Sequence, residues 1–491
     1  MLMNIRRGLI IWWMVAGLQV LSAGQNPPAP NPPVQNSGDD GASSSAGGPV
    51  RTAPAAALSV IAGMQGEGGT DDAASDLPQI PALLGGKGNS LEFLSELERS
   101  NYLRGGVNVG AAYDDNPHLV PTGLAGNASV SIFPNISIEE STSRMRWTLG
   151  YAGGLTVNQG LTNENQQSHN LNFDSEYRLS PHVNLRVAEV FSMTTGFFDA
   201  GNSPEGVAES GGPNTSLITP LATQRSSLTT VEANYHFALN DLVGASGSFY
   251  DLHFTNVPAE TQAADPLTNS ESASGSAFWL HRLFRGDWGG ASYGFERLTF
   301  SLGDGETSVH SFLAVNTLNL SKRITLSGFI GPQYSVNQGL APAGLPTQSS
   351  GWSVAGGAEA GWQNRNTNVS AGYARSISDG GGILGAVRLQ TVHGDFRREL
   401  VRAWTADLTA THGTNQSIIV PTAGSASAID LTSAGIALEH TVRKSVGFRC
   451  GYSHDFQQQL FGFTVPPQTY DAHRNRYFVT LSYEWGKPLG M

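Results

Sequence analysis

Apolar and polar residues alternate along the chain from Tyr102 to Trp485, and this period of two restricts the fold more than any other feature. In the clearest segment one face carries Tyr477, Val479, Leu481, Tyr483 and Trp485. The opposite face carries Phe478, Thr480, Ser482 and Glu484. Successive side chains of a β-strand point to opposite faces, so the pattern predicts strands with one apolar and one water-compatible surface.

The positions of aromatic residues along the apolar face distinguish a soluble β-sandwich from a membrane β-barrel. Trp352 and Trp362 share a face with small residues between them. At about 3.3 Å per residue and about 40° of tilt, the two rings would lie about 25 Å apart along a membrane normal, which is the spacing of two interfacial aromatic girdles. We predict that girdle positions include Trp147, Trp352, Trp362, Tyr477 and Trp485.

Short and long connections between the predicted strands alternate along the chain. Short turns are expected near residues 180–181, 240–241, 285–286, 321–322, 364–366 and 443–444, and long polar loops over 195–222, 256–270, 336–350, 413–426 and 456–473. Short periplasmic turns and long external loops are typical of bacterial outer-membrane barrels. We therefore predict an all-β fold: a single transmembrane antiparallel up-and-down β-barrel of about 18 strands, with 16 as the alternative.

Composition agrees with a barrel and excludes other classes. Only 14% of residues are charged, and the mean hydropathy of -0.18 is too low for a bundle of membrane helices. The net charge of -12 argues against nucleic acid as a partner, because phosphate binding needs a basic surface. Cys450 is the single cysteine, so no intramolecular disulfide is expected.

The first hundred residues predict export and a tether. Residues 1–24 combine Arg6 and Arg7 with a short apolar stretch and small residues, as in a secretory signal peptide. Residues 25–89 are rich in Pro, Gly, Ala and Ser and predict a disordered periplasmic linker. A short helix is expected over 90–100, the barrel over 101–486 and a C-terminal tail over 487–491.

Charged residues on the water-compatible face are candidates for lining a lumen. The alternation selects Arg146, Asp174, Glu176, Arg178, Arg186, Glu232, Glu359, Arg388, Asp407, Glu439, Arg449 and Glu484. Rings of such groups tune which solutes pass through a pore, although solvated charge pairs across neighbouring strands would look the same. The sequence leaves both interpretations open.

No catalytic, cofactor or metal-binding motif is expected. Asp114, Asp115 and Asn116 offer oxygen ligands for calcium, but a solvated turn before Pro117 fits better. His169 beside Ser168 has no spacing that specifies a hydrolase. An enzyme is therefore not expected.

The segment Gly105 to Asn116 resembles the opening strand of outer-membrane β-barrel porins that accompany exopolysaccharide production, in which a small-residue strand ends in Tyr-Asp-(Asp or Ser)-Asn. The resemblance implies a porin-like passive channel for small solutes or a secreted polysaccharide. The alternative is a structural or surface-binding barrel with a plugged lumen, whose long external loops bind a partner. The expected partners are outer-membrane lipid, the barrel-assembly machinery during insertion, and a small solute or polysaccharide.

Overall fold

The computed structural model describes most of the chain after residue 100. The described residues are 101–117, 126–159, 165–196, 222–255, 267–284, 286–301, 305–321, 323–340, 346–401, 403–418, 426–443, 445–461 and 468–489. The predicted signal peptide, linker and short helix lie outside them. In the described part no helix is long and apolar enough to cross a membrane.

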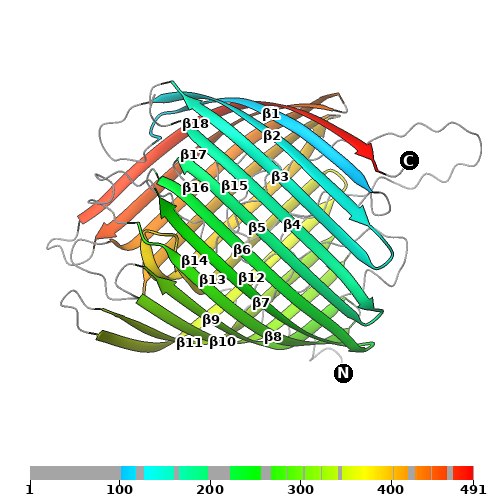
Figure 1. Cartoon of the computed structure of the whole chain (residues 1–491), viewed down its shortest axis with the longest axis vertical. Helices are drawn as coiled ribbons and strands as arrows, with labels where there is room; N and C mark the ends of the chain where they lie inside the picture. Colours follow the sequence, from blue (N-terminus) through cyan, green and yellow to red (C-terminus); the bar gives the residue numbers. More distant parts are fainter. Residues whose placement is uncertain are drawn as a thin grey trace, which may run out of the picture.

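Eighteen antiparallel strands form one closed sheet (Figure 1). They are β1 (Tyr102–Asp114), β2 (Asn127–Ser141), β3 (Met145–Asn158), β4 (Gln166–Ser180), β5 (Val183–Gly196), β6 (Ala222–Ala238), β7 (Asp241–Thr255), β8 (Ser270–Phe284), β9 (Asp287–Phe300), β10 (Gly305–Ser321), β11 (Ile324–Leu340), β12 (Pro346–Asn364), β13 (Thr367–Gly380), β14 (Leu384–Val401), β15 (Trp404–Ser417), β16 (Ala426–Arg443), β17 (Val446–Phe461) and β18 (Gln468–Pro488). Each strand pairs with the next, and β1 pairs with β18 along its whole length. The predicted fold class is confirmed.

The two ends of the barrel differ in their connections. At one end, which we call the turn end, a few residues join each even-numbered strand to the next strand, as between β2 and β3 or β4 and β5. The opposite end, which we call the loop end, carries the long connections, such as the one from Gly196 to Ala222.

Several predicted loops are shorter than expected. Strand pairing of β11 with β12 continues to Leu340 and Pro346, because polar alternation continues above the apolar band.

The last strand also runs further than expected. β18 extends to Pro488, so its pairing with β1 includes Lys487 and Pro488, which the sequence assigned to a C-terminal tail. Lys487 and Pro488 are thereby part of the ladder with β1.

Side chains alternate between an outward and an inward face on every strand. Large apolar side chains are exposed on the outward face, as with Val479, Leu481 and Tyr483 of β18. The inward face carries polar, charged and small side chains over most of the wall, for example Glu232, Asp407 and Asn415. A closed ladder pairs the backbone groups across the wall, which is the condition for strands to cross a lipid bilayer.

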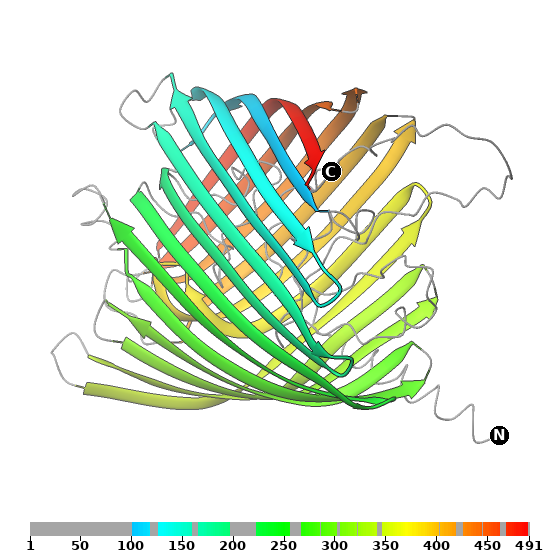
Figure 2. The same cartoon turned by 45° about the vertical axis from the view of Figure 1, so that its right-hand side comes forward.

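The wall divides between β12 and β13. Their pairing ends at Gly356 and Arg375, although β12 continues to pair with β11 as far as Pro346. Beyond this fork the tips of β13 and β14 fold into the barrel as a hairpin, residues 376–387, drawn in yellow in Figures 1 and 2. In this inner hairpin, Ile377 and Ala386 pack with Leu298, Phe300 and Val309 from the inward faces of β9 and β10.

The charges of the hairpin explain why it leaves the wall. Register places Arg375 and Arg388 on the outward face, because Arg375 opposes Gln390 and Arg388 opposes Ile377. In a regular wall this face would meet lipid, where an arginine costs about 2–4 kcal/mol at the midplane and about 0–1 kcal/mol near the interfaces. Folding inward moves both arginines to the interior. Arg388 was predicted on the lumen-facing side of its strand, whereas its register places it on the opposite face of β14.

Candidate functional site: the barrel interior

Ion pairs cross neighbouring strands on the inward face of β4–β6. Arg186 Nε donates to Asp174 Oδ2 at 2.8 Å, and Arg186 Nη1 lies 4.0 Å from Glu232 Oε2. Glu176, the register partner of both Arg146 and Arg186, accepts a 2.8 Å hydrogen bond from Asn184. One arginine therefore serves two carboxylates, which leaves this part of the wall acidic.

The neighbouring strands β1–β3 reverse this ratio. Glu139 is 4% exposed, and it lies 3.2 Å from an Arg146 guanidinium nitrogen and 3.7 Å from one of Arg104. Of these three residues, only Arg146 was predicted from the sequence to line the lumen; Glu139 and Arg104 were not. Regular alternation of Val130, Ile132, Ile136 and Ile138 around Glu139 was the signal available.

A second set of ion pairs lies on β14–β18. Arg397 contacts Glu439 at 3.0 Å and Asp407 at 3.5 Å. Arg474, 1% exposed, contacts Asp455 at 2.6 Å and Asp114 at 3.9 Å. Here the sequence identified Asp407 and Glu439 but not Arg397 or Arg474, since both arginines lie beside other charged or polar residues that obscure the alternation.

The remaining lumen candidates lie separately. Arg178 is exposed at the turn end, opposite Asn184. Glu359 is buried on β12, and its Oε2 has no hydrogen-bond partner. The Arg449 guanidinium lies 5.8 Å from the Phe478 ring centre, and Glu484 faces Gly106 across the β1–β18 pair. The structure thus distributes the candidates around the wall rather than gathering them at one point.

The inward face of β7–β13 is different, because apolar side chains pack there in a buried cluster. Its members are Leu242, Phe278, Leu280, Trp288, Leu313, Val315, Phe329, Ala355 and Ala374. A Cβ added to Gly290 or Gly331 in this region would lie within about 2 Å of a neighbouring carbonyl oxygen, at 2.0 and 1.8 Å. The glycines therefore allow the neighbouring backbone to approach closely here, beside the packed cluster.

The inner hairpin is anchored at its tip. Ser270 Oγ of β8 donates to Asp379 Oδ2 at 3.0 Å, and the Thr268 amide donates to the Gly382 carbonyl at 2.8 Å. Gly382 has a φ of +89°, which favours glycine, and an added Cβ would meet the Phe254 ring. Ile383 packs near Leu252 and Phe254. The hairpin thus joins β14 to the inner surface of β7–β10 and narrows the lumen at the loop end.

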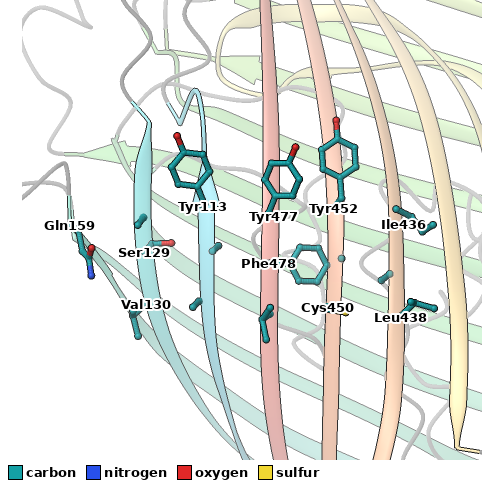
Figure 3. Close-up of a pocket in the computed structure, with 16 residues that line it drawn as sticks. Tyr113, Ser129, Val130, Gln159, Ile436, Leu438, Cys450, Tyr452, Tyr477 and Phe478 are labelled. Carbon is teal, nitrogen blue, oxygen red and sulfur yellow. The ribbon is translucent and has the colours of Figure 1, made fainter.

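Aromatic side chains form rows on the outward face. Figure 3 shows Tyr113, Tyr477 and Tyr452 side by side with their hydroxyls pointing to the same end, above an apolar depression that includes Val130, Ile436 and Leu438. The rings of Tyr334 and Trp352 also lie together, tilted by 44° with their centres 5.0 Å apart. Trp352, Trp362, Tyr477 and Trp485 are exposed, and Trp147 is half-buried.

The Asp114-Asp115-Asn116 segment closes the seam between the first and last strands. Both Asp115 carboxylate oxygens accept hydrogen bonds from Asn475, at 2.7 Å each, and Asn116 Nδ2 donates to the His473 carbonyl at 2.7 Å. Its oxygens are thus engaged with β18. The described part of the chain holds no cluster of three or more His, Cys, Asp or Glu suited to a metal ion.

An apolar outward face with aromatic rows around a charged interior is the arrangement of an outer-membrane barrel. The predicted localisation of the chain to the outer membrane is confirmed. No protein-family model and no curated protein matches the sequence.

Solved structures with a similar fold include an iron transporter, a ferric-catecholate import receptor and a siderophore receptor. The FrpB iron transporter from Neisseria meningitidis (F3-3 variant) aligns over 81% of this chain and 83% of its own, with 8% identity and a TM-score of 0.40. The ferric-catecholate import receptor Fiu from E. coli K12 aligns over 77% and 81%, with 8% identity and a TM-score of 0.39. The siderophore receptor PirA from Pseudomonas aeruginosa aligns over 78% and 80%, with 10% identity and a TM-score of 0.35. Such low values assign neither a family nor a substrate.

Proposed function

We propose that this chain is an outer-membrane transport barrel whose own hairpin narrows the lumen, so that it passes small hydrophilic solutes selectively rather than acting as an open passive porin. The observation that carries the proposal is the inner hairpin, which crosses from the β14 side of the barrel to β7–β10 and is pinned by the Ser270–Asp379 hydrogen bond. Transport through such a lumen needs a bore and a charge pattern, and no covalent chemistry.

The charge pattern favours cations. Arginines on the inward face of the wall are Arg104, Arg146, Arg178, Arg186, Arg282, Arg397, Arg449, Arg474 and Arg476. Carboxylates on that face are more numerous: Asp114, Glu139, Asp174, Glu176, Glu232, Glu296, Glu359, Asp395, Asp407, Glu439, Asp455 and Glu484. An excess of one sign in a low-dielectric channel concentrates the opposite ion.

The turn end is assigned to the periplasm, because short turns face that side in bacterial barrels. This orientation agrees with the secretory signal predicted over residues 1–24 and with insertion by a barrel-assembly machinery. A polysaccharide, as the porin resemblance implies, is the competing cargo. It would have to pass the same hairpin.

Single-channel recording in planar bilayers tests the proposal. We expect small, cation-selective current steps from the wild-type protein. Ser270→Ala removes the hydroxyl that holds Asp379, so its steps should be larger or should switch between two levels. Ser274→Ala is the matched control, since Ser274 also lies inward on β8 but bonds to Ser248 at 2.7 Å, away from the hairpin. Equal steps from all three proteins would contradict the role given to the hairpin.

A second function has its own supporting observation. Val387 and Ala386 are 0% exposed, so the hairpin is packed as tightly as a structural plug. A barrel closed in this way would serve as a surface-binding protein whose loops engage an external partner. Electrical silence of both the wild type and Ser270→Ala, in protein that shows the heat-dependent gel shift of a folded barrel, would favour this function over transport.

A further inference from the structure

Two arginines, Arg375 and Arg388, lie side by side at the base of the inner hairpin. Arg375 opposes Gln390 in the β13–β14 ladder, and Arg388 lies two residues before Gln390 on the same face. Diagonal neighbours of this kind in an antiparallel pair are within reach of long side chains. Two guanidinium groups therefore share a small area, at the base of the hairpin where β13 leaves β12.

This area is enclosed by the opposite wall. Ile377 and Ala386 lie on the same face of the hairpin as the two arginines, one step nearer the tip, and they pack against Leu298 and Val309. The face that bears the arginines is therefore turned towards the inward surface of β9 and β10. The Nε atoms of both Arg375 and Arg388 are buried and lack a hydrogen-bond partner.

The acidic groups nearby do not neutralise the pair. Asp379, at the tip, accepts the Ser270 hydroxyl, and Glu296 on β9 accepts the Ser272 hydroxyl at 3.0 Å. Among the described residues neither Arg375 nor Arg388 forms an ion pair within 4.0 Å. Arg375 donates a hydrogen bond to the neutral Tyr373 hydroxyl, which in turn donates to Gln390 at 3.3 Å. Two adjacent arginines whose buried Nε donors are unused are an arrangement that an oxyanion stabilises.

We propose that Arg375 and Arg388 form a binding site for a small oxyanion, a phosphate or a sugar carboxylate, in the crevice between the inner hairpin and the β9–β10 wall. Guanidinium groups bind both ligands through paired N–H donors. A bound anion screens the repulsion between the two arginines and so holds the hairpin in its folded-in position. The site does not depend on whether the barrel conducts, because binding is measured on the protein alone.

Isothermal titration calorimetry of the barrel in a non-ionic detergent, at constant ionic strength with chloride as the replaced ion, tests the site. The probes are inorganic phosphate and D-glucuronate. We expect at least one of them to bind the wild type, and the Arg375→Gln/Arg388→Gln double variant to bind it at least about tenfold more weakly, since charge-assisted hydrogen bonds are lost. Binding of phosphate alone identifies a phosphate site, and binding of glucuronate alone identifies a site for acidic sugars.

Arg398→Gln is the matched control, because Arg398 is an exposed arginine on the same strand near the turn end. It should bind the probe as the wild type does. If the double variant does not fold, Arg388→Lys supplies the test: it keeps the charge, loses the paired donors and should weaken binding while retaining the heat-dependent gel shift. No binding of either probe to the wild type, or undiminished binding to both arginine variants, would overturn the proposal.

Discussion

The inward face of the barrel has two unlike regions. On β1–β6 and β14–β18 it carries arginine–carboxylate pairs, with the Arg186 and Asp174 side chains each 15% exposed. On β7–β13 it carries buried apolar side chains, with Leu280 only 1% exposed. The difference shows that a large barrel need not be water-filled across its whole section. Where the neighbouring backbone approaches closely, inward side chains meet one another and pack as in a soluble core.

The largest expected effect breaks the packed region. Leu280→Ala removes a fully buried side chain that pairs in register with Leu242, and we expect a loss of about 2–5 kcal/mol in the free energy of unfolding. Leu283→Ala, on the outward face of the same strand and 47% exposed, should cost clearly less. Urea unfolding of the lipid-reconstituted barrel, followed by tryptophan fluorescence, measures both. Equal losses would mean that the β7–β13 cluster is not a core.

A smaller effect is expected in the charged region. Arg186→Gln leaves Asp174 and Glu232 without their shared cation, which should cost about 1.5–3 kcal/mol because hydrogen bonds to charged groups are lost. The control is Arg178→Gln, an exposed arginine on the preceding strand. The same urea titration distinguishes them. A loss no greater than that of the control would show that water solvates Arg186 fully.

The smallest effect is expected on the outward face at the loop end. Arg297 contacts Glu306 at 2.6 Å, but the arginine side chain is 54% exposed. Arg297→Gln should therefore change the free energy of unfolding by less than about 1 kcal/mol, and added salt should reduce the change further. A loss as large as that of Arg186→Gln would remove the distinction between enclosed and solvated pairs.

The strands could be predicted from the sequence because the lipid and the lumen impose opposite demands on adjacent residues. Tyr102, Asn127, Met145, Val183, Thr367 and Leu384 begin strands as the alternation indicates. The inner hairpin could not be predicted in this way. Alternation places Arg375, Ile377 and Arg388 together on one face and Leu389 on the other, so charged and apolar residues are mixed, and only the register with β12 shows which face would have met lipid.

The ion-pair partners of the charged residues in the lumen could not be predicted from the sequence either. Arg186 and Glu232 are distant in sequence, and the ion pair forms because β5 and β6 are adjacent across a connection of about 25 residues. The sequence indicates that a charge faces inward. Which opposite charge it meets depends on how neighbouring strands are staggered, and that stagger follows from closure of the whole cylinder.

The spacing of the outward aromatic rows determines which bilayer suits this protein. The girdle positions predicted on β18, Tyr477 and Trp485, are eight residues apart, which corresponds to about 20 Å along the membrane normal at the usual rise and tilt. This is less than the hydrocarbon thickness of an average membrane, about 30 Å. Lipids with long acyl chains must therefore compress around the seam side of the protein, and short-chain lipids should insert it fastest.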